Sequence, residues 1–257
     1  MSVAGESIAG AIRKAAASNR VALVGYLTAG FPARARFREH LLAIASAADV
    51  VEIGVPFTDP MADGMTIQRA SHHALQAGVT LPWILDELSS LKPRPEAPLL
   101  LMSYLNPLLA FGLPRLSAAA ARAGVAGFIV PDLPHEESEE LRHALNAERV
   151  ALVQMVTPVT PADRLRVLCQ ASQGFVYAVT MTGTTGKNVA VPADVIEYLD
   201  RARASSGLPV CAGFGIRGVE QVRRLHGHVD GVVVGSALVE LLEKDGDPRA
   251  FLRSLRA

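Results

Sequence analysis

Eight short runs of apolar residues recur along this 257-residue chain, and they constrain its fold more than any other feature. Each run is rich in Val, Ile and Leu and is too short to form a typical helix. Near-continuous apolar character of this kind is typical of parallel strands that are covered on both faces. The runs lie at residues 21–27, 49–55, 98–104, 126–132, 150–156, 174–180, 208–214 and 229–235.

Amphipathic stretches rich in Ala, Leu and Arg separate these runs and predict helices, among them 36–48, 137–147, 161–172 and 192–205. Residues 66–91 predict two helical pieces with a break near Thr80-Leu81-Pro82. Together with an extra N-terminal helix, the eight strand–helix units predict the α/β class, as a (β/α)8 TIM barrel. We expect residues 1–257 to form one domain.

A doubly wound open sheet is the alternative fold. That fold usually carries a glycine-rich dinucleotide-binding turn after its first strand. Here the first strand runs into TAGFP, residues 28–32, which contains no GxGxxG pattern. The barrel is therefore the favoured prediction.

The composition argues against several functional classes. Basic and acidic residues balance at 25 each, which favours neither a nucleic acid nor an anionic membrane as a partner. Two cysteines cannot build a disulfide framework and suit a reducing compartment. The N-terminus lacks the apolar core of a signal peptide, and every apolar run is shorter than the ~20 residues that cross a bilayer. These features predict a soluble, cytoplasmic protein.

Active sites of such barrels lie at the C-terminal ends of the strands. The second run contains a carboxylate there, Glu52. If Val51 and Ile53 face the helices, strand alternation points Glu52 toward the barrel axis. Burial raises the pKa of a carboxyl, which can then serve as a general acid. The alternative is an ion pair with a buried Lys or Arg, but the other runs contain neither residue.

Asp63 lies in the loop after the same run, within the sequence ADG. Either it is a second functional carboxylate or it belongs to a plain Asp-Gly turn. Asp59, before Pro60, is better explained as a turn or cap residue, and Asp132 fits either kind of role.

Two glycine turns after the seventh and eighth runs predict a phosphate site. They are GFG at 213–215 and GS at 235–236, and the second opens a predicted helix. Glycine loops and helix N-termini bind phosphate through backbone N–H groups. Ordinary close packing of a glycine turn is the alternative. The sequence TGTTGKN at 182–188 resembles a P-loop but has Met181 where that motif needs Gly and Asn188 where it needs Ser or Thr, so it is better explained as a mobile lid.

The histidines do not predict a metal site. His72 and His73 are adjacent on a helix and face different directions, and His226 and His228 precede the eighth run, remote from the predicted site. Cys211 and Cys169 show no pattern of thiol activation. We therefore expect no metal.

Seven motifs, in this order and spacing, resemble the tryptophan synthase alpha subunit family, and they extend over almost the whole chain. They are LTAGFP (27–32), VEIGVPFTDPMADGMTIQ (51–68), MSYLNP (102–107), VPDLPHEES (130–138), YAVTMTGTTG (177–186), GFGI (213–216) and VGSALV (234–239). Two departures stand out. Met65 replaces a proline of the family pattern, which is expected to loosen the loop, and Lys187-Asn188 stands where an arginine is expected nearby.

The resemblance implies a lyase of tryptophan biosynthesis. It would split indole-3-glycerol phosphate into indole and glyceraldehyde 3-phosphate by a retro-aldol reaction, without a cofactor in this chain. The resemblance assigns proton donation to indole C3 to Glu52 and acceptance of the indole N–H to Asp63. It assigns Tyr177, Tyr26, Tyr104 and Phe214 to the indole pocket, Thr185 to a closing loop, and Gly186, Gly215, Gly235 and Ser236 to the phosphate.

The resemblance also implies a partner, a tryptophan synthase beta subunit that carries pyridoxal phosphate, in an alpha2-beta2 tetramer. A stand-alone lyase that releases free indole is the alternative. Indole-glycerol-phosphate synthase would need a catalytic lysine at a strand end, and the chain offers only Lys187, in a loop. A non-catalytic relative is expected to lose Glu52 or Asp63, and both are present.

Overall fold

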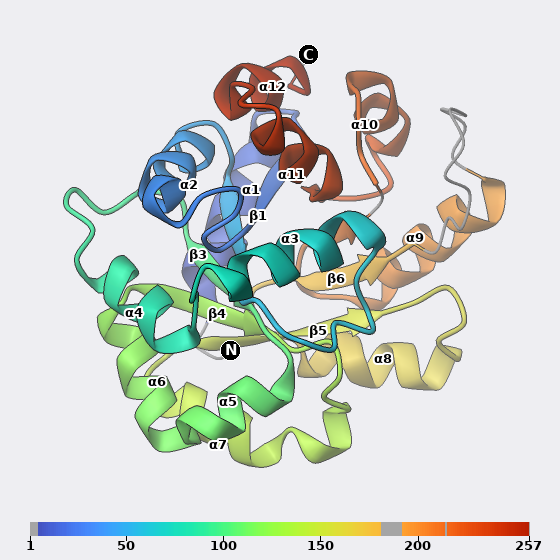
Figure 1. Ribbon diagram of the computed structural model, residues 1–257. Helices are drawn as coiled ribbons and strands as arrows, with labels where there is room; N and C mark the ends of the chain where they lie inside the picture. Colours follow the sequence, from blue (N-terminus) through green and yellow to red (C-terminus); the bar gives the residue numbers. More distant parts are fainter. Residues whose placement is uncertain (1–4, 181–191, 214, 257) are drawn as a thin grey trace.

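Eight parallel strands form a closed barrel, in which each strand pairs with its sequence neighbours and β8 pairs with β1 (Figure 1). The structure, a computed structural model, describes residues 5–180, 192–213 and 215–256. The predicted residues Thr185, Gly186 and Phe214 lie outside this described part. The strands are β1 (Ala22–Thr28), β2 (Val50–Gly54), β3 (Leu99–Met102), β4 (Val125–Ile129), β5 (Ala151–Val156), β6 (Val176–Val179), β7 (Val210–Gly213) and β8 (Gly231–Val234).

Helices surround the barrel and connect successive strands (Figure 1). They are α1 (Glu6–Ala17), α2 (Phe37–Ala45), α3 (Met65–Gln76), α4 (Leu81–Ser89), α5 (Leu105–Phe111), α6 (Leu113–Arg122), α7 (Glu139–Ala147), α8 (Ala162–Ala171), α9 (Ala193–Ser205), α10 (Val219–Leu225), α11 (Ser236–Glu243) and α12 (Pro248–Ser254). Short 3-10 turns, η1 (Arg34–Arg36) and η2 (His135–Glu137), precede α2 and α7. The described part contains no helix with the length and apolar character needed to cross a membrane.

This architecture confirms the predicted fold class, including the extra N-terminal helix. The predicted break within residues 66–91 is also confirmed, because α3 ends at Gln76 and α4 begins at Leu81. Thr80 caps α4 by accepting the Trp83 N–H at 3.4 Å. A capping hydroxyl satisfies a helix-end donor that has no partner in the helix, which explains why the second piece starts there.

Strand β2 shows the predicted alternation. Val51 and Ile53 pack in the large cluster between the barrel and the helices, whereas Val50 packs in the separate cluster inside the barrel. Glu52 lies beside Tyr26 of β1 and Leu100 of β3 in the strand register. Its side chain therefore points toward the barrel axis, and the residue is only 1% exposed.

Helix α1 covers the N-terminal end of the barrel. Ile8 and Ile12 are fully buried and pack with the inward side chains Val24 and Val50. The opposite end, where the strands finish, is thus left as the end that can open to a substrate.

Replacing Ile12 with alanine should lower the free energy of unfolding by about 2–5 kcal/mol, because it removes buried methyl groups from this plug. Urea unfolding monitored by circular dichroism measures the change. Lys14→Ala, on the exposed side of α1, is the matched control and should have little effect. Equal stability of the two variants would show that α1 does not contribute to the barrel core.

Candidate active site

A cavity of about 430 Å³ opens among the strand ends. It brings together seven of the predicted site residues from β1, β2, β6, β7 and β8 and the loops that follow them. They are Tyr26, Glu52, Asp63, Tyr177, Gly215, Gly235 and Ser236. Apolar side chains that the sequence reasoning did not single out complete the walls, namely Met102, Met155, Val179 and Val233.

The Glu52 carboxyl has no charged partner in the described part of the chain. Its Oε2 atom is buried and forms no hydrogen bond there. Burial, with a smaller contribution from the negative charge of Asp63, raises the pKa of Glu52 from 4.5 to about 8. The predicted alternative, an ion pair with a buried cation, is therefore not observed among the described residues, and Glu52 holds its proton at neutral pH.

Asp63 lines the same cavity, from the loop between β2 and α3. Its backbone N–H donates to the Pro60 carbonyl at 3.1 Å, and its carbonyl accepts from Gln68 Nε2 at 2.8 Å. The loop is thus fixed at Asp63 by two hydrogen bonds. Burial raises the pKa of the Asp63 carboxyl to about 6, against the opposing effect of a hydrogen bond from Tyr104.

Tyr104 lies behind Asp63 and is not one of the residues that line the cavity. Its hydroxyl donates to Asp63 Oδ2 at 3.2 Å and accepts the Ala62 N–H at 2.9 Å. Its ring stacks on Phe57, with the ring centroids 5.1 Å apart. These contacts hold the Tyr104 hydroxyl where it orients the Asp63 carboxylate.

Two glycines make room for the tyrosines inside the cavity, a feature that the sequence reasoning missed. A Cβ atom at Gly54 would lie 2.1 Å from the Tyr26 hydroxyl oxygen, and one at Gly213 would lie 2.6 Å from the Tyr177 ring. Because both contacts are impossibly short, each ring position depends on the glycine beside it. A glycine at the end of one strand, with an inward-facing tyrosine on the neighbouring strand, is the sequence signal that could have predicted this.

The predicted phosphate residues line the cavity from the loops that follow β7 and β8. Gly215 adopts the left-handed conformation, with φ 51°, and lines the cavity. Gly235 is the N-cap of α11, and Ser236 is the first residue of that helix. The first turn of a helix leaves backbone N–H donors without partners inside the helix, so this wall can accept an anion.

Two other acids near the strand ends have structural partners. Asp59 accepts from the Thr58 hydroxyl, and its carbonyl accepts the Met61 N–H at 2.9 Å, which confirms the prediction of a turn residue. Asp132 accepts the Leu105 N–H at 2.9 Å, at the start of α5.

Met65, which departs from the family pattern, begins α3 and is 80% exposed.

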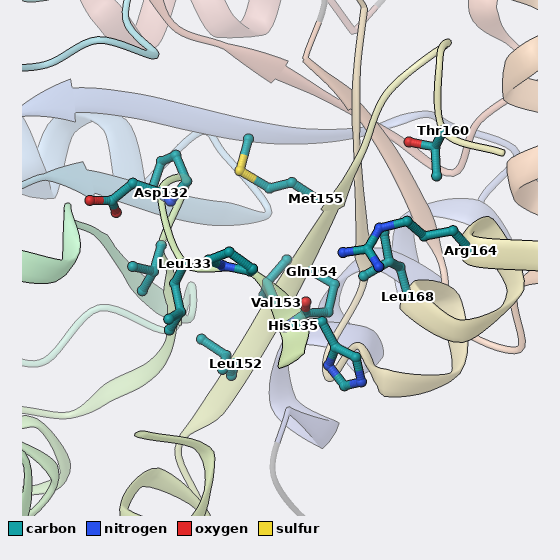
Figure 2. Close-up of a pocket in the computed structure, with 13 residues that line it drawn as sticks. Asp132, Leu133, His135, Leu152, Val153, Gln154, Met155, Thr160, Arg164 and Leu168 are labelled. Carbon is teal, nitrogen blue, oxygen red and sulfur yellow. The ribbon is translucent and has the colours of Figure 1, made fainter. Parts of the chain in front are cut away.

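A second cavity, of about 340 Å³, lies between the loop after β4, strand β5 and helix α8 (Figure 2). In Figure 2 the Arg164 guanidinium points toward the other lining side chains, whereas the Asp132 carboxylate points away from them. Arg164 is already bound to Glu136 through two hydrogen bonds of 2.5 and 2.9 Å. Glu52 and Asp63 do not line this cavity, so the acid–base chemistry belongs to the first cavity.

The described residues contain no group of three or more His, Cys, Asp or Glu arranged to hold a metal ion. Cys169 and Cys211 are both buried, and burial raises the pKa of each thiol. Neither cysteine is therefore an activated nucleophile.

The closed parallel barrel, with two carboxyl groups lining one cavity among its strand ends, defines the class of (β/α)8-barrel enzymes. Within this class the sequence matches one family, described as "Tryptophan synthase alpha chain", over residues 12–255. The chain belongs to this family, whose members are lyases of tryptophan biosynthesis. The resemblance seen in the sequence motifs is thereby confirmed.

Individual relatives agree with the family. The tryptophan synthase alpha chain of Nitratidesulfovibrio vulgaris strain Hildenborough is 45% identical over 244 residues, which cover 95% of each chain. The structure of Mycobacterium tuberculosis tryptophan synthase in an aminoacrylate-bound form matches with a TM-score of 0.87 at 32% identity and covers 97% of each chain. The alpha subunit from Legionella pneumophila strain Paris matches with a TM-score of 0.87 at 31% identity and covers 97% of each chain.

The raised pKa of Glu52 predicts a pH-dependent stability. Because its pKa is about 8 in the folded state and 4.5 ordinarily, the folded state binds the extra proton between these pH values. The stabilisation is complete below the unfolded-state pKa and is lost as pH rises through the folded-state value. As pH rises through this window, the free energy of unfolding of the wild type should therefore fall relative to that of Glu52→Gln, by up to ~1.4 kcal/mol per pH unit.

Urea unfolding of wild type and Glu52→Gln at pH 5 and pH 8 measures this difference. Asp63 titrates in both proteins, so its contribution largely cancels in the comparison. Unfolding free energies that differ by the same amount at both pH values would contradict the raised pKa.

Proposed function

We propose that this chain catalyses the retro-aldol cleavage of indole-3-glycerol phosphate to indole and glyceraldehyde 3-phosphate. The observation that carries the proposal is the buried Glu52 carboxyl, whose Oε2 atom has no described hydrogen-bond partner and which lines the same cavity as Asp63. An acid that is protonated at neutral pH and a second carboxylate that is largely ionised form an acid–base pair. Family membership supports the same reaction.

In the proposed mechanism, Glu52 gives its proton to indole C3 while Asp63 takes the proton of the indole N–H. Indole C3 then becomes tetrahedral, and its bond to the glycerol phosphate part of the substrate weakens. The Glu52 carboxylate next takes the proton of the neighbouring hydroxyl group. The C–C bond breaks, the aldehyde forms, and Asp63 returns its proton to the ring nitrogen. Both carboxyl groups end in their starting states, so no cofactor is needed in this chain.

The walls of the cavity fit an indole ring. Tyr26 and Tyr177 face the cavity beside Glu52, and we propose that they, with Phe214, hold the ring. Tyr104 keeps the Asp63 carboxylate oriented through the hydrogen bond of 3.2 Å. Thr185 is proposed to act from the closing loop, outside the described residues. Orientation of this kind lowers the barrier by fixing the reacting groups in advance.

The phosphate is proposed to bind to backbone N–H groups of Gly186, Gly215, Gly235 and Ser236. The position of Gly215 and of the first turn of α11 on one wall of the cavity supports this role. The N-terminus of a helix favours an anion through its free N–H groups and its dipole.

We further propose that the chain, as one barrel domain, assembles with a tryptophan synthase beta subunit into an alpha2-beta2 tetramer in the cytoplasm. Pyridoxal phosphate would belong to the beta subunit. The likeness to the structure of Mycobacterium tuberculosis tryptophan synthase supports this assembly. A stand-alone lyase is the alternative, and nothing in the geometry of the cavity favours it.

Glu52→Gln should lower kcat by ~10²–10⁴-fold, because the amide keeps the shape and loses the transferable proton. Substrate binding should persist, since the proposed phosphate contacts come from the loops after β7 and β8 and not from Glu52. Release of indole from indole-3-glycerol phosphate measures the rate. Glu136→Gln, a change in the ion pair beside the second cavity, is the control and should keep normal activity. A folded Glu52→Gln protein with wild-type kcat would exclude the proposed acid role.

Mixing the chain with a tryptophan synthase beta subunit should give a complex with the mass of two chains of each kind. Light scattering after size-exclusion chromatography measures that mass. Changes at His226 and His228, before β8 and at the end of the barrel remote from the cavity, should leave the complex intact. Separate elution of the two proteins at all concentrations would favour the stand-alone lyase.

A further inference from the structure

Arg217 lies at the mouth of the active-site cavity, two residues after Gly215. Of the described residues that line this cavity, Arg217 is the only one with a cationic side chain. The cavity also contains the Oε2 atom of Glu52, which is buried and has no hydrogen-bond partner among the described residues. This is a second observation that points to ligand binding in the cavity. The family motif GFGI ends one residue before Arg217.

Glu240 of α11 holds the Arg217 guanidinium in place. The two Nη atoms of Arg217 donate to the two carboxylate oxygens of Glu240 at 2.7 and 2.9 Å. Thr66, in the first turn of α3, donates to Glu240 Oε1 at 3.2 Å. The hydrogen bond from Arg217 lowers the pKa of Glu240 to about 2, so the pair stays ionised throughout the neutral pH range.

The geometry of α11 directs this pair toward the proposed phosphate. Glu240 follows Ser236 by four residues, and side chains at this spacing lie on the same face of a helix. The two hydrogen bonds to Glu240 use two of the five N–H donors of the Arg217 guanidinium, which leaves three for another acceptor. The backbone N–H of Arg217 already donates to Gln221 Oε1 at 2.8 Å. Any contact of Arg217 with an anion is therefore made by its guanidinium.

A phosphate dianion at this wall would gain from such a cation. Backbone N–H groups supply hydrogen bonds without a full charge, whereas charge-assisted bonds from Arg to phosphate are roughly twice as strong as neutral ones. The planar guanidinium also matches two phosphate oxygens at once. An arginine held at the mouth would both attract the dianion and fix its orientation.

We infer that Arg217 binds the phosphate group of the substrate directly, and that Glu240 acts as a positioning residue that keeps the guanidinium over the N-terminus of α11. This inference rests on the proposed function, because it places the substrate phosphate at Gly215, Gly235 and Ser236. It adds a charged, side-chain contact to a phosphate site otherwise made of backbone groups.

The test compares Arg217→Gln with Arg69→Gln. Arg69 pairs with Glu243 at 2.5 Å, so it too bridges to α11 through an exposed ion pair, but it does not line the cavity. Arg217→Gln should raise KM for indole-3-glycerol phosphate by about tenfold with kcat nearly unchanged, as expected for loss of one charge-assisted hydrogen bond. It should also weaken binding of inorganic phosphate, measured by NMR titration, by a similar factor. Arg69→Gln should change neither value.

Glu240→Gln separates positioning from direct contact. It should raise KM by less than Arg217→Gln does, and the double variant should resemble Arg217→Gln alone, because Glu240 acts through the arginine. A purely structural role for the pair would instead lower kcat and stability together in both variants. Circular dichroism and melting temperature identify that outcome, which would overturn the inference.

The role of Arg217 and the proposed function can be rejected independently of each other. Indole formation by the wild type, with unchanged KM and phosphate affinity in Arg217→Gln, would overturn the role of Arg217 and leave the proposed function standing. Absence of indole formation by the wild type would reject the proposed function. The phosphate titration would still support or overturn the role of Arg217, because it requires no turnover.

Discussion

A carboxyl group buried inside the barrel, with no described cation beside it, is the constraint on which the proposed chemistry depends. Glu52 is 1% exposed, and its Oε2 atom has no hydrogen-bond partner in the described chain. A charged form would be costly there, so the group keeps its proton. The parallel barrel creates this environment, because β2 lies between β1 and β3 and directs Glu52 to the axis.

The other features of the cavity follow from keeping two acids in different protonation states. Asp63 is less deeply buried and accepts a hydrogen bond from Tyr104, so its pKa rises only to about 6. The negative charge of Asp63 in turn favours the protonated form of Glu52. Ser236 and the glycines after β7 and β8 line the same cavity and offer backbone N–H groups for an anion. Proton transfer and substrate anchoring would thus use different groups of one cavity.

Much of this arrangement could be predicted from the sequence, because the period of apolar residues determines both the barrel and the side to which Glu52 points. The turn at Asp59 and the helix that starts at Ser236 also carry local signals. The space that Gly54 and Gly213 leave for the tyrosine rings could not be predicted, since it depends on how neighbouring strands are aligned. The position of Tyr104 behind Asp63 and the fork between Arg217 and Glu240 likewise join segments far apart in the sequence.

A site-resolved titration of Glu52 tests the central claim most directly. NMR of protein labelled with carbon-13 at the glutamate carboxyl carbon reports the protonation of each side chain, and Glu52→Gln assigns the signal by its loss. We expect this signal to titrate near pH 8, well above the ordinary value of 4.5. A titration midpoint near 4.5 would contradict it, because Glu52 would then carry no proton to give at neutral pH.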